Sequence, residues 1–375
     1  MEYKVRPCYA EVNLTNIKHN LNEVRSIVKN KKIIGVVKAN AYGHGDIEVS
    51  RALISSGVDI LAVATVEEAL KLRNYYDVKI LVLGPVSEYQ IKDCIINRIS
   101  FIASDENYIK IVESISNQLG ISSSVHFAVD TGMGRVGFPL NTYNLNEALD
   151  LIKLIINSKN ICLEGIFTHF ASSDDDDLSF MYKQYNLFLN LINKALEFKS
   201  DIEYIHCQNS GGILNLDDSV CNAVRPGIIL YGYKPSLVSK HSIDLKPALS
   251  WKTKVSFIKR VLKDTPIGYG SAYKATENCT ILTLPLGYAD GLRRDLFTKG
   301  VVSIKNRLFP IVGKICMDQA MVCVPNNFEC SVGDTVELIN STELTANDMA
   351  DKLNTIAYEI LCGISDRVPR VYIDK

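Results

Sequence analysis

The chain has 375 residues, of which 47% are hydrophobic and 22% are charged, and its formal net charge is -1. This composition is typical of a globular protein with room for two domains. The near balance of charge argues against nucleic acid or an anionic membrane as a partner. The first residues lack the apolar core of a signal peptide, and no apolar run approaches the roughly 18 residues of a transmembrane helix, so we expect no membrane segment.

The ten cysteines are scattered along the chain and form no C-x-x-C motif. Cys316, Cys323 and Cys330 are evenly spaced, but no further ligand beside them would complete a metal site. We therefore expect reduced thiols in a cytoplasmic protein and no bound metal.

From residue 33 to residue 231, β-rich runs alternate with amphipathic helical segments. Asn13 or Thr15 is expected to cap the first helix, over residues 16–28. Eight β/α repeats predict a (β/α)8 TIM-type barrel over residues 9–240, and a doubly wound sheet with an extra strand is the weaker alternative. The predicted strands cover residues 32–38, 59–64, 79–84, 99–104, 125–130, 161–170, 202–207 and 223–232.

After about residue 240, helical periodicity gives way to short strands separated by Gly, Pro and Asn. This texture predicts a C-terminal mainly-β domain formed by residues 241–375, with a first strand taken from residues 1–8. One short helix is expected over residues 345–354. The acidic run at 172–177 precedes a long helix of the barrel, and we interpret it as a solvated loop rather than an ion site.

Polar side chains gather where the predicted barrel strands end, which is the side on which TIM barrels carry their active sites. The eighth predicted strand carries Arg225 and Gly227 near its start, which would lie at the opposite side of the barrel unless R-P-G forms a loop or the strand is entered differently. The side chains that follow the other strands are Lys38, Tyr42, Arg135, His169, Asn209 and Ser210.

Each of these residues has a purely structural alternative, such as a core histidine, a turn at N-S-G-G, or a surface ion pair for Arg135. Their coincidence on one rim favours an anionic ligand. Backbone N–H groups of N-S-G-G and R-P-G-I would hold a phosphate. An aldehyde on the same ligand would explain Lys38, because its amine forms a Schiff base with a carbonyl. Pyridoxal phosphate carries both groups.

Longer motifs surround these residues in the order VVKANAYGHG, DTGMGRVGF, THFA, QNSGG, VRPGIILYG, GYG at 268–270, LPLGYADG, GKICMDQ and RVPR. In this order and spacing, over nearly its whole length, the sequence resembles bacterial alanine racemase, a fold-type III pyridoxal-phosphate enzyme. The resemblance implies a cytoplasmic homodimer with shared active sites. It also implies interconversion of L- and D-alanine, which supplies D-alanine for peptidoglycan.

The resemblance implies two catalytic bases, which suits a reaction that removes a proton from one face of the α-carbon and delivers another to the opposite face. Lys38 would carry the cofactor and serve one face, and Tyr269 of the partner subunit would serve the other. His169, backed by Arg225, would favour the phenolate through a charge-assisted hydrogen-bond chain. Arg225 would also face the pyridine nitrogen and leave it unprotonated, which weakens the electron sink and limits transamination.

The remaining contacts implied by the resemblance divide between cofactor and substrate. Arg135 would contact the phenolic oxygen of the cofactor and the substrate carboxylate. Met317 of the partner subunit, with Asp318 beside it, would bind that carboxylate through its backbone N–H, and Tyr288 would narrow the entrance. The phosphate end of the cofactor would be held by Tyr42, Ser210, Gly227 and Ile228, and Asn209 of N-S-G-G is a further cofactor-binding candidate.

Two positions depart from the family pattern. Ala128 stands where relatives often carry a carbamylated lysine, and Asp366 stands where many have a tyrosine near the phosphate. Substrate preference therefore stays open, and a serine or broad-specificity small amino-acid racemase is the first alternative. A non-catalytic pyridoxal-phosphate carrier would resemble the barrel alone. A barrel decarboxylase would show a glycine-rich phosphate motif and a catalytic cysteine loop, which this sequence lacks.

Overall fold

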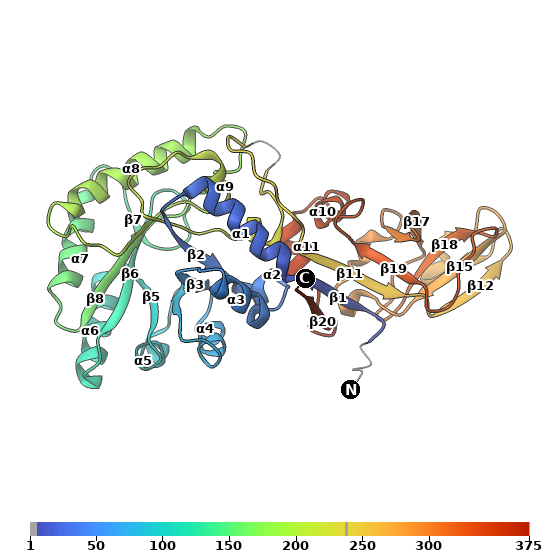
Figure 1. Ribbon diagram of the computed structural model, residues 1–375, viewed down its shortest axis with the longest axis horizontal. Coiled ribbons are helices and arrows are strands. Elements are labelled where there is room, and N and C mark those ends of the chain that lie inside the picture. The colour runs from blue at the N-terminus through green and yellow to red at the C-terminus, as the bar shows by residue number, and fades with distance from the viewer. Residues whose placement is uncertain (1–5, 237–238, 375) are drawn as a thin grey trace. The chain divides into compact units, whose positions relative to one another are not determined.

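The computed structural model describes residues 6–236 and 239–374, which form two compact units (Figure 1). The larger unit consists of Lys18–Ala41 and Asp46–Leu245. The smaller unit contains the described residues up to Ile17, the segment Tyr42–Gly45, and the described residues from Lys246 onward. Lys38 and Tyr42, only four positions apart, therefore belong to different units.

The larger unit is a closed barrel whose eight parallel strands, counted within the described residues, follow one another around it, the last pairing with the first. Such strands are covered on both faces, so their sequences are almost continuously apolar rather than alternating. All eight predicted strands are present, which confirms the (β/α)8 prediction. They are β2 (Lys32–Val36), β3 (Ile60–Val63), β4 (Lys79–Val82), β5 (Ile99–Ala103), β6 (Ser123–Asp130), β8 (Ile161–Phe167), β9 (Tyr204–His206) and β10 (Ala223–Val224). The short β7 (Phe138–Pro139) pairs with β6.

Helices cover the outside of the barrel strands (Figure 1). Asn13 caps the first of them, because its Oδ1 accepts the backbone N–H of Asn16 at 3.1 Å. Each longer helix buries one apolar stripe, as Phe188, Leu191 and Ile192 do in the longest. The helices are α1 (Leu14–Val28), α3 (Asp46–Ser55), α4 (Val66–Arg73), α5 (Glu88–Ile96), α6 (Glu106–Leu119), α7 (Leu145–Asn157), α8 (Ser179–Leu196) and the short α9 (Ser210–Asn215).

The eighth strand is shorter than predicted. It ends at Val224, and the residues beyond Gly227 form the 3-10 helix η1 (Ile228–Tyr231), so the predicted strand through residue 232 is wrong. Pro226 has no N–H to give to a ladder, and Gly227 adopts φ -117, ψ -100, which is incompatible with a strand. Because the strand precedes Arg225, this residue lies at the carboxyl-terminal end of the barrel after all.

The smaller unit is mainly β, as predicted. Its N-terminal strand covers Tyr9–Asn13 rather than residues 1–8, of which 1–5 lie outside the described residues. The helix predicted at 345–354 is present as α10 (Ala346–Leu353), capped by Thr345, and a further helix α11 (Ala357–Cys362) was not predicted. One sheet of the described residues has the order β12 (Phe257–Val261), β15 (Cys279–Leu284), β18 (Ala320–Pro325), β17 (Arg307–Val312), β16 (Val301–Ile304), β19 (Thr335–Ile339), β11 (Leu249–Lys254), β1 (Tyr9–Asn13) and β20 (Arg370–Ile373), and β13 (Pro266–Ile267) pairs with β14 (Tyr273–Lys274).

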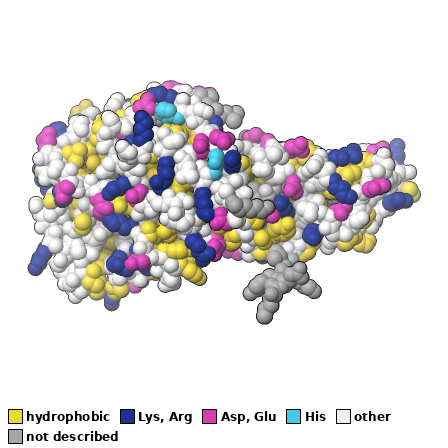
Figure 2. Space-filling view, in the orientation of Figure 1, with side chains coloured by type: hydrophobic (Ala, Val, Ile, Leu, Met, Phe, Trp, Pro, Cys, Tyr) yellow, Lys and Arg dark blue, Asp and Glu magenta, His cyan; other side chains and the backbone are white. Residues whose placement is uncertain are grey.

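Charged side chains of both signs are intermixed over the face shown in Figure 2, in keeping with the net charge of -1. Within the described residues, no helix has both the length and the apolar character needed to cross a membrane. All ten cysteines are free thiols. The carboxylates at 174–177 are exposed in the loop before α8, and Asp177 accepts the N–H of Ser179 at 2.9 Å.

Candidate active site

Four of the sequence-predicted side chains converge at the carboxyl-terminal rim of the barrel. Lys38 follows β2, which is hydrogen-bonded to β10, the strand that leads into Arg225. Nδ1 of His169 lies 3.3 Å from a terminal nitrogen of Arg225. Desolvation lowers the pKa of His169 well below its ordinary value, and the positive charges of Arg225, Arg135 and Lys38 lower it further. The three cations lower the pKa of His169 because they lie near its ring and disfavour the positively charged imidazolium.

Two loops on this rim are joined to each other. Asn209 caps α9, with its Oδ1 accepting the N–H of Gly212 at 2.9 Å, and the Ser210 hydroxyl accepts the N–H of Gly227 at 3.0 Å. A Cβ added to Gly211 would lie 2.6 Å from the Ser173 hydroxyl, so the loop requires glycine there. Since α9 and η1 both begin at this point, their first backbone N–H groups provide donors for an anion.

The segment after Lys38 has a strained backbone. Ala39, Asn40, Ala41 and Tyr42 all have φ of 52–53°, in the left-handed region that costs non-glycine residues about 1–2 kcal/mol each. Glu68 compensates part of this strain. Its carboxylate accepts the N–H of Ala39 at 2.6 Å and, from the turn before α4, the N–H groups of residues 64 and 65 at 2.8 and 3.3 Å. Strain of this kind is a recurrent property of functional sites.

Arg135 lies exposed in a loop that is shaped by Asp130. The Asp130 carboxylate accepts the N–H groups of Gly132 and Gly134 at 2.8 and 3.1 Å. Strand β6, which leads into this loop, carries Ala128, which is buried in an apolar cluster with Ile102, Phe167, Leu83 and Val136. Val136 of this loop therefore packs against an apolar cluster that contains no charged side chain.

The site residues predicted after residue 240 belong to the smaller unit and share high exposure. Tyr269, Tyr288 and Met317 are 67%, 44% and 53% exposed. The segments of Tyr288 and Met317 pack closely at Gly287, because a Cβ on this glycine would lie only 2.4 Å from the Met317 carbonyl oxygen. Asp318 forms an ion pair with Arg367 at 2.7 Å. Exposed side chains of this size are typical of contact surfaces.

Comparison with known proteins extends over both units. The domain models for the alanine racemase N-terminal and C-terminal domains match residues 12–235 and 248–372. Alanine racemase 2 of Caldanaerobacter subterraneus subsp. tengcongensis is 42% identical over 375 residues, which covers 99% of this chain and 96% of that protein. The chain belongs to the alanine racemase family. It is an amino-acid racemase, as the motifs predicted.

Solved structures agree with this assignment. Alanine racemase of Clostridium difficile 630 superposes with a TM-score of 0.93 at 40% identity and covers 100% of this chain and 97% of its own. Alanine racemase of Bartonella henselae, which contains covalently bound pyridoxal phosphate, gives a TM-score of 0.87 at 28% identity, covering 98% and 99%.

Sequence reasoning missed a chain of buried polar groups inside the racemase barrel. It runs from Arg225 through His206 and His126 to Glu164, with successive distances of 2.6, 3.0 and 3.2 Å. The three missed residues were visible only as polar interruptions in strands that are otherwise apolar. The capping role of Glu68 was also missed, although T-V-E-E fits a capping box.

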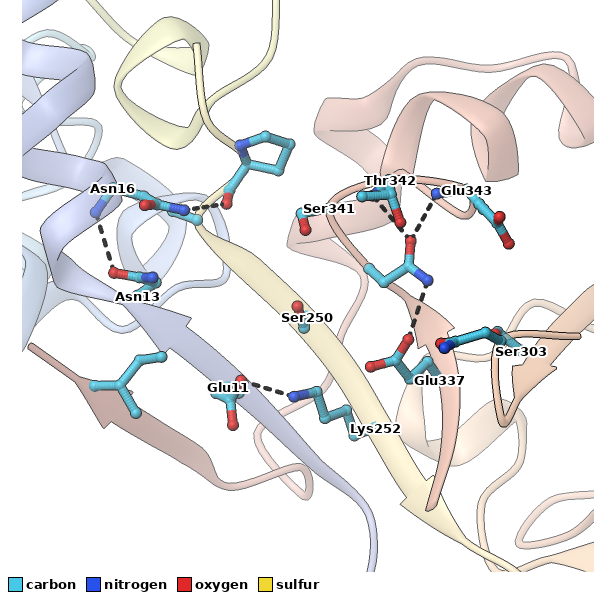
Figure 3. Close-up of a pocket in the computed structure, with 15 residues that line it drawn as sticks. Glu11, Asn13, Asn16, Ser250, Lys252, Ser303, Glu337, Ser341, Thr342 and Glu343 are labelled. Atoms are coloured by element: carbon cyan, nitrogen blue, oxygen red, sulfur yellow. Dashed lines mark hydrogen bonds and ion pairs between the residues drawn. The ribbon is translucent and has the colours of Figure 1, made fainter. Parts of the chain in front are cut away.

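The racemase also contains a polar cavity of about 640 Å³ in its smaller unit (Figure 3). Three of its charged groups contact neighbours in the cavity: Lys252 pairs with Glu11 at 2.7 Å, and Glu337 accepts from Asn340 at 3.0 Å (Figure 3). Its lining, as far as the described residues go, includes none of the predicted site residues.

Proposed function

We propose that this racemase interconverts L- and D-alanine with pyridoxal phosphate held on Lys38. The convergence of Lys38, His169 and Arg225 at one rim of a barrel with an anion-binding loop pair carries this proposal. The relatives named above are alanine racemases matched along their whole length, and the Bartonella henselae protein carries the same cofactor covalently.

The donor set on the rim fits this cofactor. A lysine amine is available for its aldehyde, and the linked loops of Ser210 and Gly227, together with Ile228, Asn209 and Tyr42, would hold its phosphate. The Arg225 guanidinium can only donate, so it would face an unprotonated pyridine nitrogen. When bound, the cofactor withdraws electrons from the α-carbon of the amino acid and makes its proton acidic.

The chain's own residues would then move that proton. The Lys38 amine would take or return it on one face of the α-carbon, and the phenol of Tyr269 from the partner subunit would do so on the other face. Arg135 would hold the substrate carboxylate together with the backbone N–H of the partner subunit's Met317. His169 is held neutral by desolvation and by three nearby cations, so its ring accepts or donates hydrogen bonds without adding charge.

The proposal includes a homodimer with shared sites, supported by the exposure of Tyr269, Tyr288 and Met317. Tyr288 would narrow the entrance to the site. In a reducing cytoplasm, which ten free thiols favour, the product D-alanine would supply peptidoglycan. A serine racemase is the second candidate, because the carboxylate of Asp366 is exposed and could accept a hydrogen bond from a substrate hydroxyl.

The test measures turnover of L- and D-alanine and of L- and D-serine by the purified enzyme, with and without added pyridoxal phosphate. We expect alanine turnover in both directions, stimulated by the cofactor, and much slower serine turnover. A higher specificity for serine would support the second candidate, and no turnover of either would reject both.

The shared site is tested by mixing two inactive variants, Lys38→Ala and Tyr269→Ala. Random pairing makes half of the dimers mixed, and each mixed dimer has one intact site, so roughly a quarter of all sites should recover. No recovery in isolated mixed dimers would mean that both residues act within one subunit.

A further inference from the structure

The buried guanidinium of Arg225 has no direct anionic partner. It donates to the carbonyl oxygens of Thr168, His206 and Cys207 at 2.8, 3.1 and 3.2 Å, and to the Nδ1 atoms of His206 and His169 at 2.6 and 3.3 Å. Among the described residues, no carboxylate forms an ion pair with it. A buried charge without compensation is strongly unfavourable, so a more distant counter-charge is expected.

The thiol of Cys221 does not provide this charge. The Sγ atoms of Cys207 and Cys221 lie 3.4 Å apart. The hydrogen bond from Cys207, together with burial, raises the pKa of Cys221 far above its ordinary value, so this thiol stays neutral.

The chain of imidazoles leads instead to Glu164. Nε2 of His206 lies 3.0 Å from Nδ1 of His126, and Nε2 of His126 lies 3.2 Å from the Glu164 carboxylate. Ser100 donates to the same carboxylate at 2.5 Å and Lys79 at 2.9 Å. Burial alone would raise the pKa of Glu164, but the hydrogen bond and electrostatic attraction of His126 and the hydrogen bonds from Ser100 and Lys79 lower this pKa to about 2. The ion pair with Lys79 at 2.9 Å also favours the charged carboxylate. Glu164 is therefore ionised.

The guanidinium of Arg225 can only donate hydrogen bonds, so its bond to His206 determines which ring nitrogen carries the proton in His206 and in His126. Nδ1 of His206 must accept from Arg225, so the ring of His206 carries its proton on Nε2 and donates to Nδ1 of His126. His126 must then carry its proton on Nε2 and donate to Glu164. Both imidazoles are neutral, and all three hydrogen bonds point from Arg225 toward Glu164.

The walls of the barrel hold the two rings in this arrangement. Phe167 stacks on His206 with centroids 4.9 Å apart and an interplanar angle of 4°, and Tyr204 stacks on His126 at 5.9 Å and 22°. Gly165 makes room for His126, because a Cβ there would lie 2.5 Å from its Nδ1. The rings thus have little freedom to turn.

We infer that Glu164 is a positioning residue for Arg225, whose counter-charge it supplies through the neutral rings of His126 and His206. The chain cannot conduct a proton through Arg225, which does not give one up. It transmits orientation and polarisation, which fixes the guanidinium. This inference rests on the proposed function, in which Arg225 faces the pyridine nitrogen.

The first test determines the tautomers of the histidines by ¹⁵N NMR of the holoenzyme labelled at its six histidines, with signals assigned from His126→Gln and His206→Gln. We expect a protonated Nε2 and a bare Nδ1 on both residues. A proton on Nδ1 of either ring overturns the inference. This test needs no variant of Glu164, and it stands whether or not the enzyme racemises alanine.

The second test compares Glu164→Gln with Glu203→Gln in the holoenzyme. Glu203 is the matched control, because it also accepts from Lys79 at 2.8 Å but lies outside the chain. A glutamine at position 164 leaves the tautomers set by Arg225 but removes the negative charge, so the hydrogen bond from His126 Nε2 becomes weaker. We therefore expect the ¹⁵N signal of His126 Nε2 to shift in Glu164→Gln and to stay unchanged in Glu203→Gln.

The kinetic expectation follows from the same geometry. In Glu164→Gln, kcat for alanine should fall about tenfold with KM little changed, since loss of the charge that polarises the histidine chain acts on catalysis rather than on binding. Equal effects of the two variants, or an unchanged His126 Nε2 signal in Glu164→Gln, would overturn the inference. If the wild-type enzyme does not turn over alanine, the proposed function fails, while the NMR result still decides the role of Glu164.

Discussion

The left-handed turn after Lys38 depends on Glu68, and replacing this residue is the sharpest stability test that the structure offers. The Glu68 carboxylate accepts three backbone N–H groups, including that of Ala39 at 2.6 Å. Glu68→Gln keeps the shape and removes the charge and part of the accepting capacity. Glu67→Gln is the matched control, because Glu67 lies in the same first turn of α4 but its carboxylate accepts from a side chain, that of Gln90 at 2.8 Å, and within the described residues from no backbone N–H.

The expected magnitude follows from the bonds that are weakened. A hydrogen bond to a charged group contributes about 1.5–3 kcal/mol, and a neutral one about 0.5–1.5 kcal/mol. Because one acceptor oxygen remains and Glu68 is only half-buried, we expect Glu68→Gln to lower the free energy of unfolding by about 2 kcal/mol. In a unit of this size that corresponds to a fall in Tm of roughly 4–8 °C. The interaction with the helix dipole, about 0.3–1 kcal/mol, is lost equally in both variants.

Thermal unfolding and a cofactor titration measure the two consequences. The relaxed turn should also displace Lys38, so the Kd for pyridoxal phosphate should rise by up to about tenfold, or 1.4 kcal/mol, in Glu68→Gln alone. Equal Tm values for the two variants would refute the stabilising role of Glu68. A lower Tm with an unchanged Kd would show that the strained turn does not position Lys38.

Three further outcomes are expected. The pKa of Glu164 is lowered from 4.5 to about 2, so its ionised form stabilises the fold above about pH 4.5, and this contribution of roughly 3 kcal/mol is lost as the pH falls toward 2. In Glu164→Gln, the free energy of unfolding measured in urea should therefore decrease less steeply as the pH falls from 4.5 to 2. The same pH dependence as in the wild type would contradict an ionised Glu164. Borohydride reduction should fix the cofactor on the peptide that contains Lys38, whereas label at Lys31 or Lys32 by mass spectrometry would exclude this assignment. Asp366→Tyr should tighten cofactor binding by up to roughly tenfold, since a phenol donates to a phosphate that a carboxylate repels; an unchanged Kd would remove Asp366 from the site.

Much of the fold could be predicted from the amino-acid sequence alone. Strands buried on both faces leave continuous apolar runs, so all eight barrel strands could be located without coordinates. Lys38 stood out because it ends such a run abruptly, and the short helix expected over residues 345–354 corresponds to α10. These features are local, since each depends on residues within one turn or one strand.

The tertiary structure decided what depends on residues distant in sequence. The sequence left open at which end of its strand Arg225 lies, because the pairing of β10 with β2 and β9, and not the apolar run through residue 232, determines where that strand stops. The left-handed turn carries no glycine at residues 39–42 that would announce it, and it persists through Glu68, a residue of another element. The direction of the hydrogen bonds between Arg225 and Glu164 depends on strand register and on distances of about 3 Å, which no sequence pattern encodes.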